Sequence, residues 1–180
     1  FRTTFVDFPE LLVYPWYIHQ GMVPYRDFII PYTPILNYLL YPLYLIMGFS
    51  PQSERIIAYT AILLTDVTIY YLVKHLTKKR WAALISLIFF VFWQPIIAGN
   101  THWHETIMTP LFLVVYWLAV RHRKKPSFRQ AVVIGVLLAF LTLMKQTAVW
   151  FAVIIIIFMG ARYIPVIAII IGLSHVLVWG

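Results

Sequence analysis

The chain alternates between long apolar runs and short polar stretches. Six runs carry almost no charge, and they cover residues 56–73, 82–98, 107–120, 131–144, 148–159 and 164–179. The first would be about 27 Å long as a helix, close to the thickness of a bilayer's hydrocarbon core. The runs 131–144 and 148–159 are shorter, so we expect the turn between them to dip into the headgroup region or the bilayer. The pattern predicts an all-α, polytopic membrane protein in which 55–180 forms a bundle of about six spans.

The first 54 residues have a different composition. They hold seven of the 11 prolines, and seven tyrosines lie between positions 14 and 44. Proline at this density interrupts long helices and tyrosine favours the membrane interface, so we expect 1–54 to be an extracytoplasmic first loop with juxtamembrane helices. Residues 35–49 could instead cross the membrane. That would place Asp7 and Asp27 on the other side of the membrane from Glu105, so we favour a position of 35–49 at the membrane interface. We also expect a span before Phe1 and a continuation beyond Gly180.

Composition supports a bilayer environment. Hydrophobic residues make up 62% and charged residues 11% of the 180 positions, and the mean hydropathy is +0.84. A soluble domain usually carries about 25% charged residues. The chain has no cysteine, which excludes disulfides, cysteine-ligated zinc, iron–sulfur clusters and thiol redox chemistry.

The charges are sorted by their position along the chain. Ten of the 14 basic residues lie at alternate ends of the apolar runs: Lys74, Lys78, Lys79 and Arg80; Arg121, Arg123, Lys124, Lys125 and Arg129; and Arg162. The positive-inside rule places these ends in the cytoplasm, so the net charge of +8 does not indicate a nucleic-acid partner. By this alternation five of the six carboxylates and Lys145 lie on the extracytoplasmic side, and Asp66 alone lies in mid-span.

One membrane face therefore collects the groups that lipid-phosphate chemistry needs. A transferase acting there needs a carboxylate base for the incoming nucleophile, cations for the leaving phosphate and an apolar groove for the lipid tail. The candidate acids are Asp7, Glu10, Asp27 and Glu105, and the candidate cations are Arg26, Lys145 and Arg55. His102, His104 and Glu105 are weak evidence of a metal site, because no third histidine lies nearby.

The motifs along the chain resemble those of GT-C membrane glycosyltransferases. The first loop carries them as Asp7-Phe8-Pro9-Glu10, Gly21-Met22-Val23-Pro24-Tyr25-Arg26-Asp27-Phe28, Pro31-Tyr32-Thr33-Pro34 and Gly48-Phe49-Ser50. They continue as Thr65-Asp66, Asn100-Thr101-His102-Trp103-His104-Glu105 and Leu143-Met144-Lys145-Gln146-Thr147-Ala148. The chain is thus similar to an N-terminal part of the protein O-mannosyltransferase and aminoarabinose-transferase-like enzymes and of the RgtA/B/C/D-like bacterial proteins.

This resemblance implies an activity and a location. Such enzymes transfer a sugar from a polyprenyl-phosphate donor to a lipid, glycan or protein hydroxyl, usually with inversion, outside the cytoplasm and as integral proteins of the cell membrane. Relatives often have a lysine before paired prolines where this chain has Tyr32-Thr33-Pro34, so a phosphate contact at that position is not expected here. The sequence identifies no cofactor, and it leaves open whether the enzyme uses a divalent cation.

The resemblance also implies residue roles. It makes Asp7 the general base, with Glu10 as the runner-up, and Glu105 a ligand of the acceptor or the sugar. It makes Lys145 a contact of the donor phosphate, where a point charge stabilises the leaving group. Arg26 is the second phosphate candidate, and the further candidate substrate-binding residues are Asp27 and His104.

Structural roles stay open for the same residues. Asp7 and Glu10 could cap a helix that begins near Pro9, and Arg26 with Asp27 could be an ion pair that fixes a turn. Glu105 could complement a helix N-terminus, and Lys145 could extend to the lipid headgroups. Asp66 could be held between helices by hydrogen bonds. In a secondary transporter or lipid flippase, which is the alternative to the enzyme, it would be the coupling residue.

Overall fold

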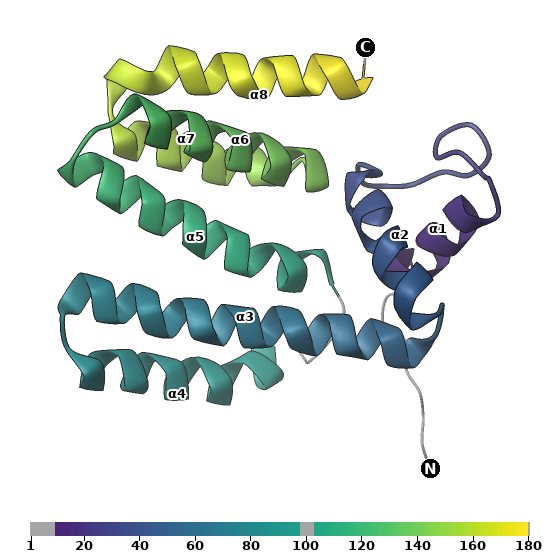
Figure 1. The fold of residues 1–180 in the computed structure, drawn as a ribbon, viewed down its shortest axis with the longest axis horizontal. Coiled ribbons are helices and arrows are strands. Elements are labelled where there is room, and N and C mark those ends of the chain that lie inside the picture. Colours follow the sequence, from purple (N-terminus) through teal and green to yellow (C-terminus); the bar gives the residue numbers. More distant parts are fainter. Residues whose placement is uncertain (1–9, 98–102, 180) are drawn as a thin grey trace. The chain divides into compact units, whose positions relative to one another are not determined.

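The computed structural model describes residues 10–97 and 103–179, and this part of the chain is helical (Figure 1). Its α-helices are α1 (Glu10–His19), α2 (Ile35–Met47), α3 (Pro51–Thr77), α4 (Arg80–Ile97), α5 (His104–Lys124), α6 (Phe128–Met144), α7 (Ala148–Met159) and α8 (Ile164–Trp179), with the 3-10 turn η1 (Ala161–Tyr163) before α8. Within these ranges there is no strand, and the only bridge pairs Pro24 with Phe28. The prediction of an all-α fold is confirmed.

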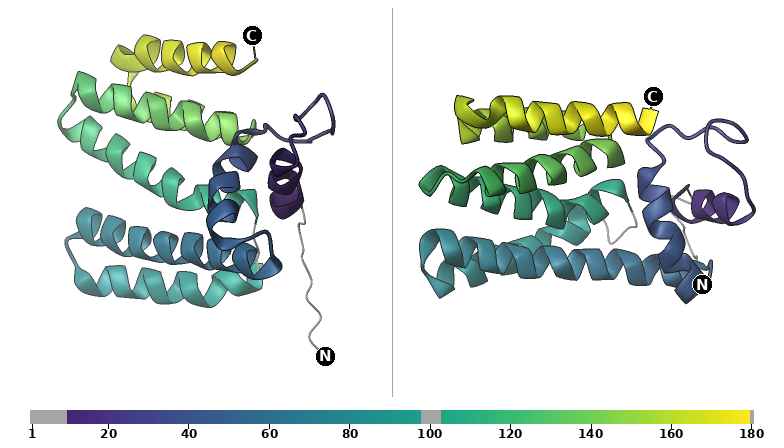
Figure 2. Two further views of the ribbon diagram at one scale, coloured as in Figure 1. Left: turned by 45° about the vertical axis from the view of Figure 1, so that its right-hand side comes forward. Right: turned by 45° about the horizontal axis from the view of Figure 1, so that its top comes forward.

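The chain divides into two compact units, 1–110 and 111–180, with the boundary inside α5. In the first unit α3 and α4 form an antiparallel hairpin, and α1 packs on α2 and contacts α3 (Figure 1). In the second unit α6 packs against α8 and α7 (Figure 2). The expected division into a loop, 1–54, and a bundle, 55–180, stays a prediction.

The long helix α3 has clear signals at both ends. Ser50 has an extended backbone, its Oγ accepts a hydrogen bond from the Ser53 amide at 3.2 Å, and Pro51 follows at the first helical position. Lys78 ends the helix in the left-handed conformation at φ 60°, and its amide donates to the carbonyl of Lys74. These caps explain why α3 covers 27 residues although its apolar run covers only 56–73.

The other helix bounds follow the apolar runs with extensions into polar sequence. Helices α7 and α8 match the predicted runs 148–159 and 164–179, whereas α5 begins at His104 and ends at Lys124, beyond the run 107–120 at both ends. The apolar run marks the part of a helix that suits lipid, and the helix continues wherever its polar residues keep helical hydrogen bonds.

Prolines between residues 10 and 54 interrupt helices less than predicted. Helices α1 and α2 are short, with 10 and 13 residues, but each continues through an internal proline, Pro15 or Pro42. A proline inside a helix removes one hydrogen bond and bends the axis, and a short helix can tolerate that loss. Gly48, at φ 84°, then ends α2 in a conformation that other residues rarely adopt.

Large apolar side chains cover one exposed face of α4. They recur at helical spacing, and each is more than 60% exposed: Trp81, Ile85, Ile88, Phe89, Phe92 and Ile96. Such a stripe would aggregate in water and is suited to contact with lipid. By length and composition α3 qualifies as a membrane span within the described ranges, and α2, α4, α6, α7 and α8 are apolar but shorter. The count of about six spans therefore stays a prediction.

Candidate functional site

Of the acidic candidates, Glu10 lies at the start of α1. Asp7, the predicted base, lies outside the described residues, as does His102. Glu10 is the first residue of α1, which agrees with a helix beginning near Pro9. Its Oε2 atom is buried and has no hydrogen-bond partner in the described part of the chain. Burial raises the pKa of Tyr14, one turn further along, and the charge of Glu10 raises it too. An unpaired carboxylate oxygen is what a proton acceptor requires.

Arg26 and Asp27 form a closed turn after Pro24. The Asp27 carboxylate accepts hydrogen bonds from Arg26 Nε at 3.1 Å, from Arg26 Nη2 at 2.8 Å and from the Val23 amide at 2.7 Å. The Arg26 hydrogen bonds come first in holding the pKa of Asp27 below its ordinary value, and the Val23 hydrogen bond contributes. The structural role that the sequence left open is therefore present, so Arg26 must leave Asp27, or share it, to bind a phosphate.

An aromatic cluster joins Tyr32 to the start of α5. The ring of Tyr32 lies 4.4 Å from His104 and 6.3 Å from Trp103, centroid to centroid, and Tyr32 O accepts a hydrogen bond from the Tyr25 hydroxyl at 2.7 Å. His104 is buried, whereas Glu105, the next residue, is exposed on the first turn of α5. The sequence named His104 and Glu105 but gave no signal that Tyr32 and Trp103 would pack beside them.

Lys145 lies at the turn between α6 and α7, as the sequence predicted. Its amide donates to the carbonyl of Leu141 at 3.1 Å, its carbonyl accepts from the Ala148 amide at 3.0 Å, and its side chain is half-buried. This turn belongs to the second unit. The backbone hydrogen bonds of this turn thus fix the position of Lys145 between α6 and α7.

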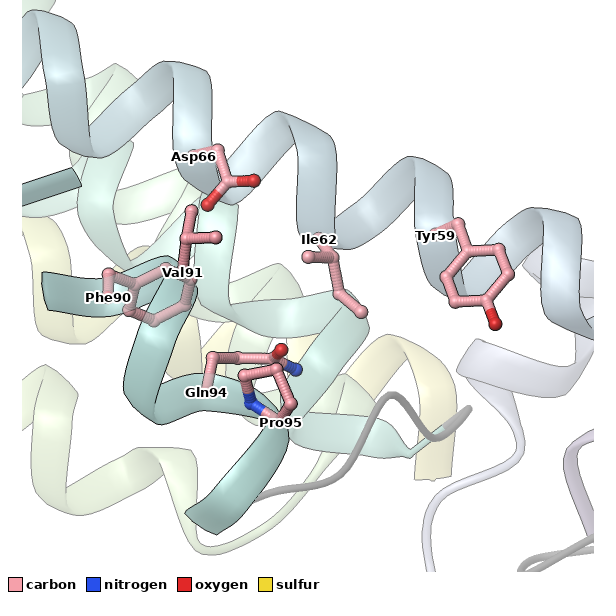
Figure 3. Close-up of a pocket in the computed structure, with 7 residues that line it drawn as sticks. All are labelled: Tyr59, Ile62, Asp66, Phe90, Val91, Gln94 and Pro95. Atoms are coloured by element: carbon pink, nitrogen blue, oxygen red, sulfur yellow. The ribbon is translucent and has the colours of Figure 1, made fainter. Parts of the chain in front are cut away.

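Asp66 lies beside a pocket between α3 and α4 (Figure 3). The pocket has a volume of about 180 Å³, and its other lining side chains include Tyr59, Ile62, Phe90, Val91 and Gln94. The Oδ1 atom of Asp66 is buried and has no hydrogen-bond partner within 10–97 and 103–179. The nearby hydroxyls of Thr65 and Thr68 do not hold Asp66, because they donate to the carbonyls of Ala61 and Leu64 in their own helix.

His122 is a buried polar residue that sequence reasoning missed. It lies near the end of α5, packs edge-on against Tyr163 at 4.7 Å and contacts the Ser127 amide at 3.5 Å. Burial lowers the pKa of His122, which favours its neutral form. A histidine within a basic cluster gives no sequence signal that it will be buried.

No group of three histidine, cysteine, aspartate or glutamate side chains converges as metal ligands within the described residues. The chemistry that these residues can perform on their own is proton acceptance by a carboxylate and charge stabilisation by a lysine or arginine.

The helical fold and the exposed apolar faces suit a membrane protein, and the family comparison identifies it as a membrane-embedded glycosyltransferase of the GT-C type. Comparison with known families matches residues 31–179 to dolichyl-phosphate-mannose-protein mannosyltransferases, and the chain belongs to this family. The match includes His104, Glu105 and Lys145, and it begins after Arg26 and Asp27. No curated protein and no solved structure matches the chain.

Proposed function

We propose that this protein transfers a hexose-like sugar, mannose being the first choice, from a polyprenyl-phosphate donor to a lipid, glycan or protein hydroxyl at the extracytoplasmic membrane face. The observation that carries the proposal is the family match across 31–179. The family's description supports a lipid-phosphate sugar donor and a protein acceptor, and the apolar helices support a donor whose tail stays in the bilayer.

The proposed reaction is a single displacement with inversion. Asp7 takes the proton of the acceptor hydroxyl, and the acceptor oxygen attacks the anomeric carbon opposite the phosphate. The bond from that carbon to the phosphate oxygen breaks, and the polyprenyl phosphate leaves with the bonding electrons. Glu10, whose Oε2 atom has no hydrogen-bond partner among the described residues, is the second candidate for the base.

Cations and neighbouring polar groups complete the proposed site. Lys145 stabilises the charge that develops on the leaving phosphate, and Arg26 can do so once it exchanges Asp27 for the phosphate. Glu105, exposed beside the aromatic cluster of Tyr32, Trp103 and His104, binds acceptor or sugar hydroxyls. Aromatic faces suit the apolar C–H side of a sugar ring, which supports placing the sugar at this cluster.

A transfer assay tests the proposal. Membranes that contain the protein are incubated with radiolabelled polyprenyl-phosphate mannose, and the labelled product is identified. We expect the Asp7→Asn variant to lose at least about a hundredfold in rate, because the general base is lost. The matched control is Asp66→Asn, which removes a carboxylate outside the proposed site and is expected to keep the rate. Wild-type turnover by Asp7→Asn would remove Asp7 from the mechanism.

The pocket at Asp66 is the one observation that favours a secondary transporter or flippase instead. A transporter of this kind would need Asp66 for coupling, so Asp66→Asn would abolish its activity while Asp7→Asn would not. The two variants therefore give opposite results under the two functions.

A further inference from the structure

The second unit, 111–180, carries positive charges and no negative side chain. It contains seven basic residues and no aspartate or glutamate, because all six carboxylates of the chain precede position 111. Five of the seven lie between Arg121 and Arg129, and a sixth is Arg162 in η1. No acid of the unit itself can neutralise these cations, so an anion that pairs with them comes from outside the unit.

Aromatic contacts bring two of the arginines to one place. The Cζ atom of Arg123, near the end of α5, lies 4.9 Å from the ring centre of Phe158, near the end of α7. The Cζ atom of Arg162 lies 5.5 Å from the ring centre of Tyr163. His122 and Tyr163, the neighbours of the two arginines, are in edge-on contact at 4.7 Å. Both guanidinium groups therefore lie beside the junction of α5, α7 and η1, within reach of a single headgroup.

The rings hold the arginines in a way that leaves hydrogen-bond donors available. An arginine over an aromatic ring is held by cation–π attraction, which does not consume its five N–H donors. Arg123 Nη1 donates to the carbonyl of Phe158 at 3.5 Å, and the side chains of Arg123 and Arg162 are exposed. A planar guanidinium whose position is already restrained suits a phosphate, to which it can donate two parallel hydrogen bonds.

The level of the two arginines favours the phosphate of a lipid over a dissolved one. Arg123 lies three residues beyond the apolar run 107–120, and Arg162 lies three residues beyond the end of α7. The ends of apolar helices lie near the headgroups of a bilayer. Toward the middle of α7, Ile154 and Ile157 are 64% and 71% exposed and can contact acyl chains. A glycerophospholipid supplies both the phosphodiester and the chains.

We propose that Arg123 and Arg162 bind the phosphodiester of an anionic glycerophospholipid, whose acyl chains lie along the exposed side of α7. An anionic headgroup is preferred because a zwitterionic one would bring a further cation to a surface that has six and no acid of its own unit to pair with it. The lipid is a bound partner at this end of the second unit and takes no part in sugar transfer.

The positive-inside rule also places basic residues at this end, but it requires only charge. Under that rule Lys124 and Lys125, two exposed lysines of the same cluster, serve as well as the two arginines. A built site instead depends on the guanidinium groups that the rings of Phe158 and Tyr163 hold. Replacing the two arginines or the two lysines removes the same number of charges, so these variants separate the two explanations.

Lipid titration of the purified protein tests the proposal. Native mass spectrometry in detergent measures binding of phosphatidylglycerol and of phosphatidylcholine with the same acyl chains, without the long-range attraction of a charged bilayer. We expect phosphatidylglycerol to bind about tenfold more tightly. Arg123→Gln with Arg162→Gln should weaken its binding about tenfold, because two charge-assisted contacts are lost, and Lys124→Gln with Lys125→Gln should weaken it less than about twofold. Equal losses in the two variants, or no lipid preference in the wild-type protein, would overturn the proposal.

Two further measurements test the geometry and the source of the phosphate. Arg123→Lys with Arg162→Lys keeps both charges but loses the planar donors, so we expect most of the affinity for phosphatidylglycerol to be lost. Wild-type affinity in this variant would overturn the role of the guanidinium groups. Inorganic phosphate should not displace the lipid, and displacement would assign the site to dissolved phosphate instead. Thermal unfolding without lipid shows that each variant folds. Sugar transfer is not measured, so the outcome is separate from that of the Asp7 variant.

Discussion

Arg26 and Asp27 show how a pair of adjacent charges acquires a defined geometry. The sequence predicted either a phosphate contact or an ion pair, and the structure shows the ion pair with a further hydrogen bond from the Val23 amide. The choice could not be made from the sequence, because it depends on the backbone turn that brings Val23 to the carboxylate. The turn is formed by Pro24 and by Tyr25, which has a positive φ of 64°.

The titration of Asp27 provides a direct test of this turn. Because its folded pKa lies below the ordinary value of 3.8, the ion pair stabilises the turn at pH values above about 4 and is lost as the pH falls through the lower folded pKa. The chain has three aspartates, so ¹³C-labelled aspartate should give resonances that the Asp27→Asn variant assigns. We expect Arg26→Gln to raise the midpoint of Asp27 and Arg55→Gln to leave it unchanged. An equal titration midpoint of Asp27 in the wild-type protein, in Arg26→Gln and in Arg55→Gln would contradict the ion pair in this turn.

Lys145 is the residue on which the proposed donor site depends. We expect Lys145→Ala to raise the apparent donor KM about tenfold or more, because an ammonium that contacts phosphate is lost, and to leave the acceptor KM nearly unchanged. Lys125→Ala, in the α5–α6 cluster, is the control and should change neither constant. Donor KM at the wild-type value in Lys145→Ala would assign the lysine a structural role, such as reaching the headgroups.

At the scale of elements, the helices could be predicted and their caps and contacts could not. The apolar runs place α7 and α8 at their observed bounds. The run 56–73 predicts a helix shorter than α3. The observed ends of α3 are set by Ser50 and Lys78, through hydrogen bonds and backbone conformation. Which helices pack together is not encoded in the runs, and the close contact of α6 with α8 was not predicted.

Gly135 explains part of that contact. A Cβ atom added to Gly135 would lie 3.0 Å from Ile170 Cδ1 and 3.5 Å from the Cα of Ile167. We expect Gly135→Leu to destabilise the protein by about 1–3 kcal/mol, because the larger side chain overpacks the contact. Gly135→Ala should change stability by less than about 1 kcal/mol, because the methyl of Ile170 can move and alanine favours the helix.

Thermal unfolding in detergent measures these changes. Gly172→Leu, on α8, is the control, because no atom lies within 4 Å of the added Cβ. Unchanged thermal stability of Gly135→Leu, with the control also unchanged, would show that α6 and α8 do not approach closely at this point.

At the scale of the whole molecule, hydropathy and charge predicted an all-helical membrane protein, and the motifs predicted the family. Both are confirmed, the family over 31–179. The candidate site was predicted less completely. The sequence named Glu105 and His104 but missed the aromatic cluster, since packing between Tyr32 and His104 joins segments that are distant along the chain. The pocket lined by Asp66 and Gln94 likewise appears only once α3 and α4 are paired.

The central claim is that Asp7 and Glu105, two acids of the proposed site, share one side of the membrane, opposite the basic clusters. Single cysteines at positions 7, 105, 79 and 125 can be labelled with a membrane-impermeant maleimide in intact cells and again after permeabilisation, without background from native thiols. We predict that positions 7 and 105 react in intact cells and that 79 and 125 react only after permeabilisation. Labelling of 7 and 105 from opposite sides would contradict the account.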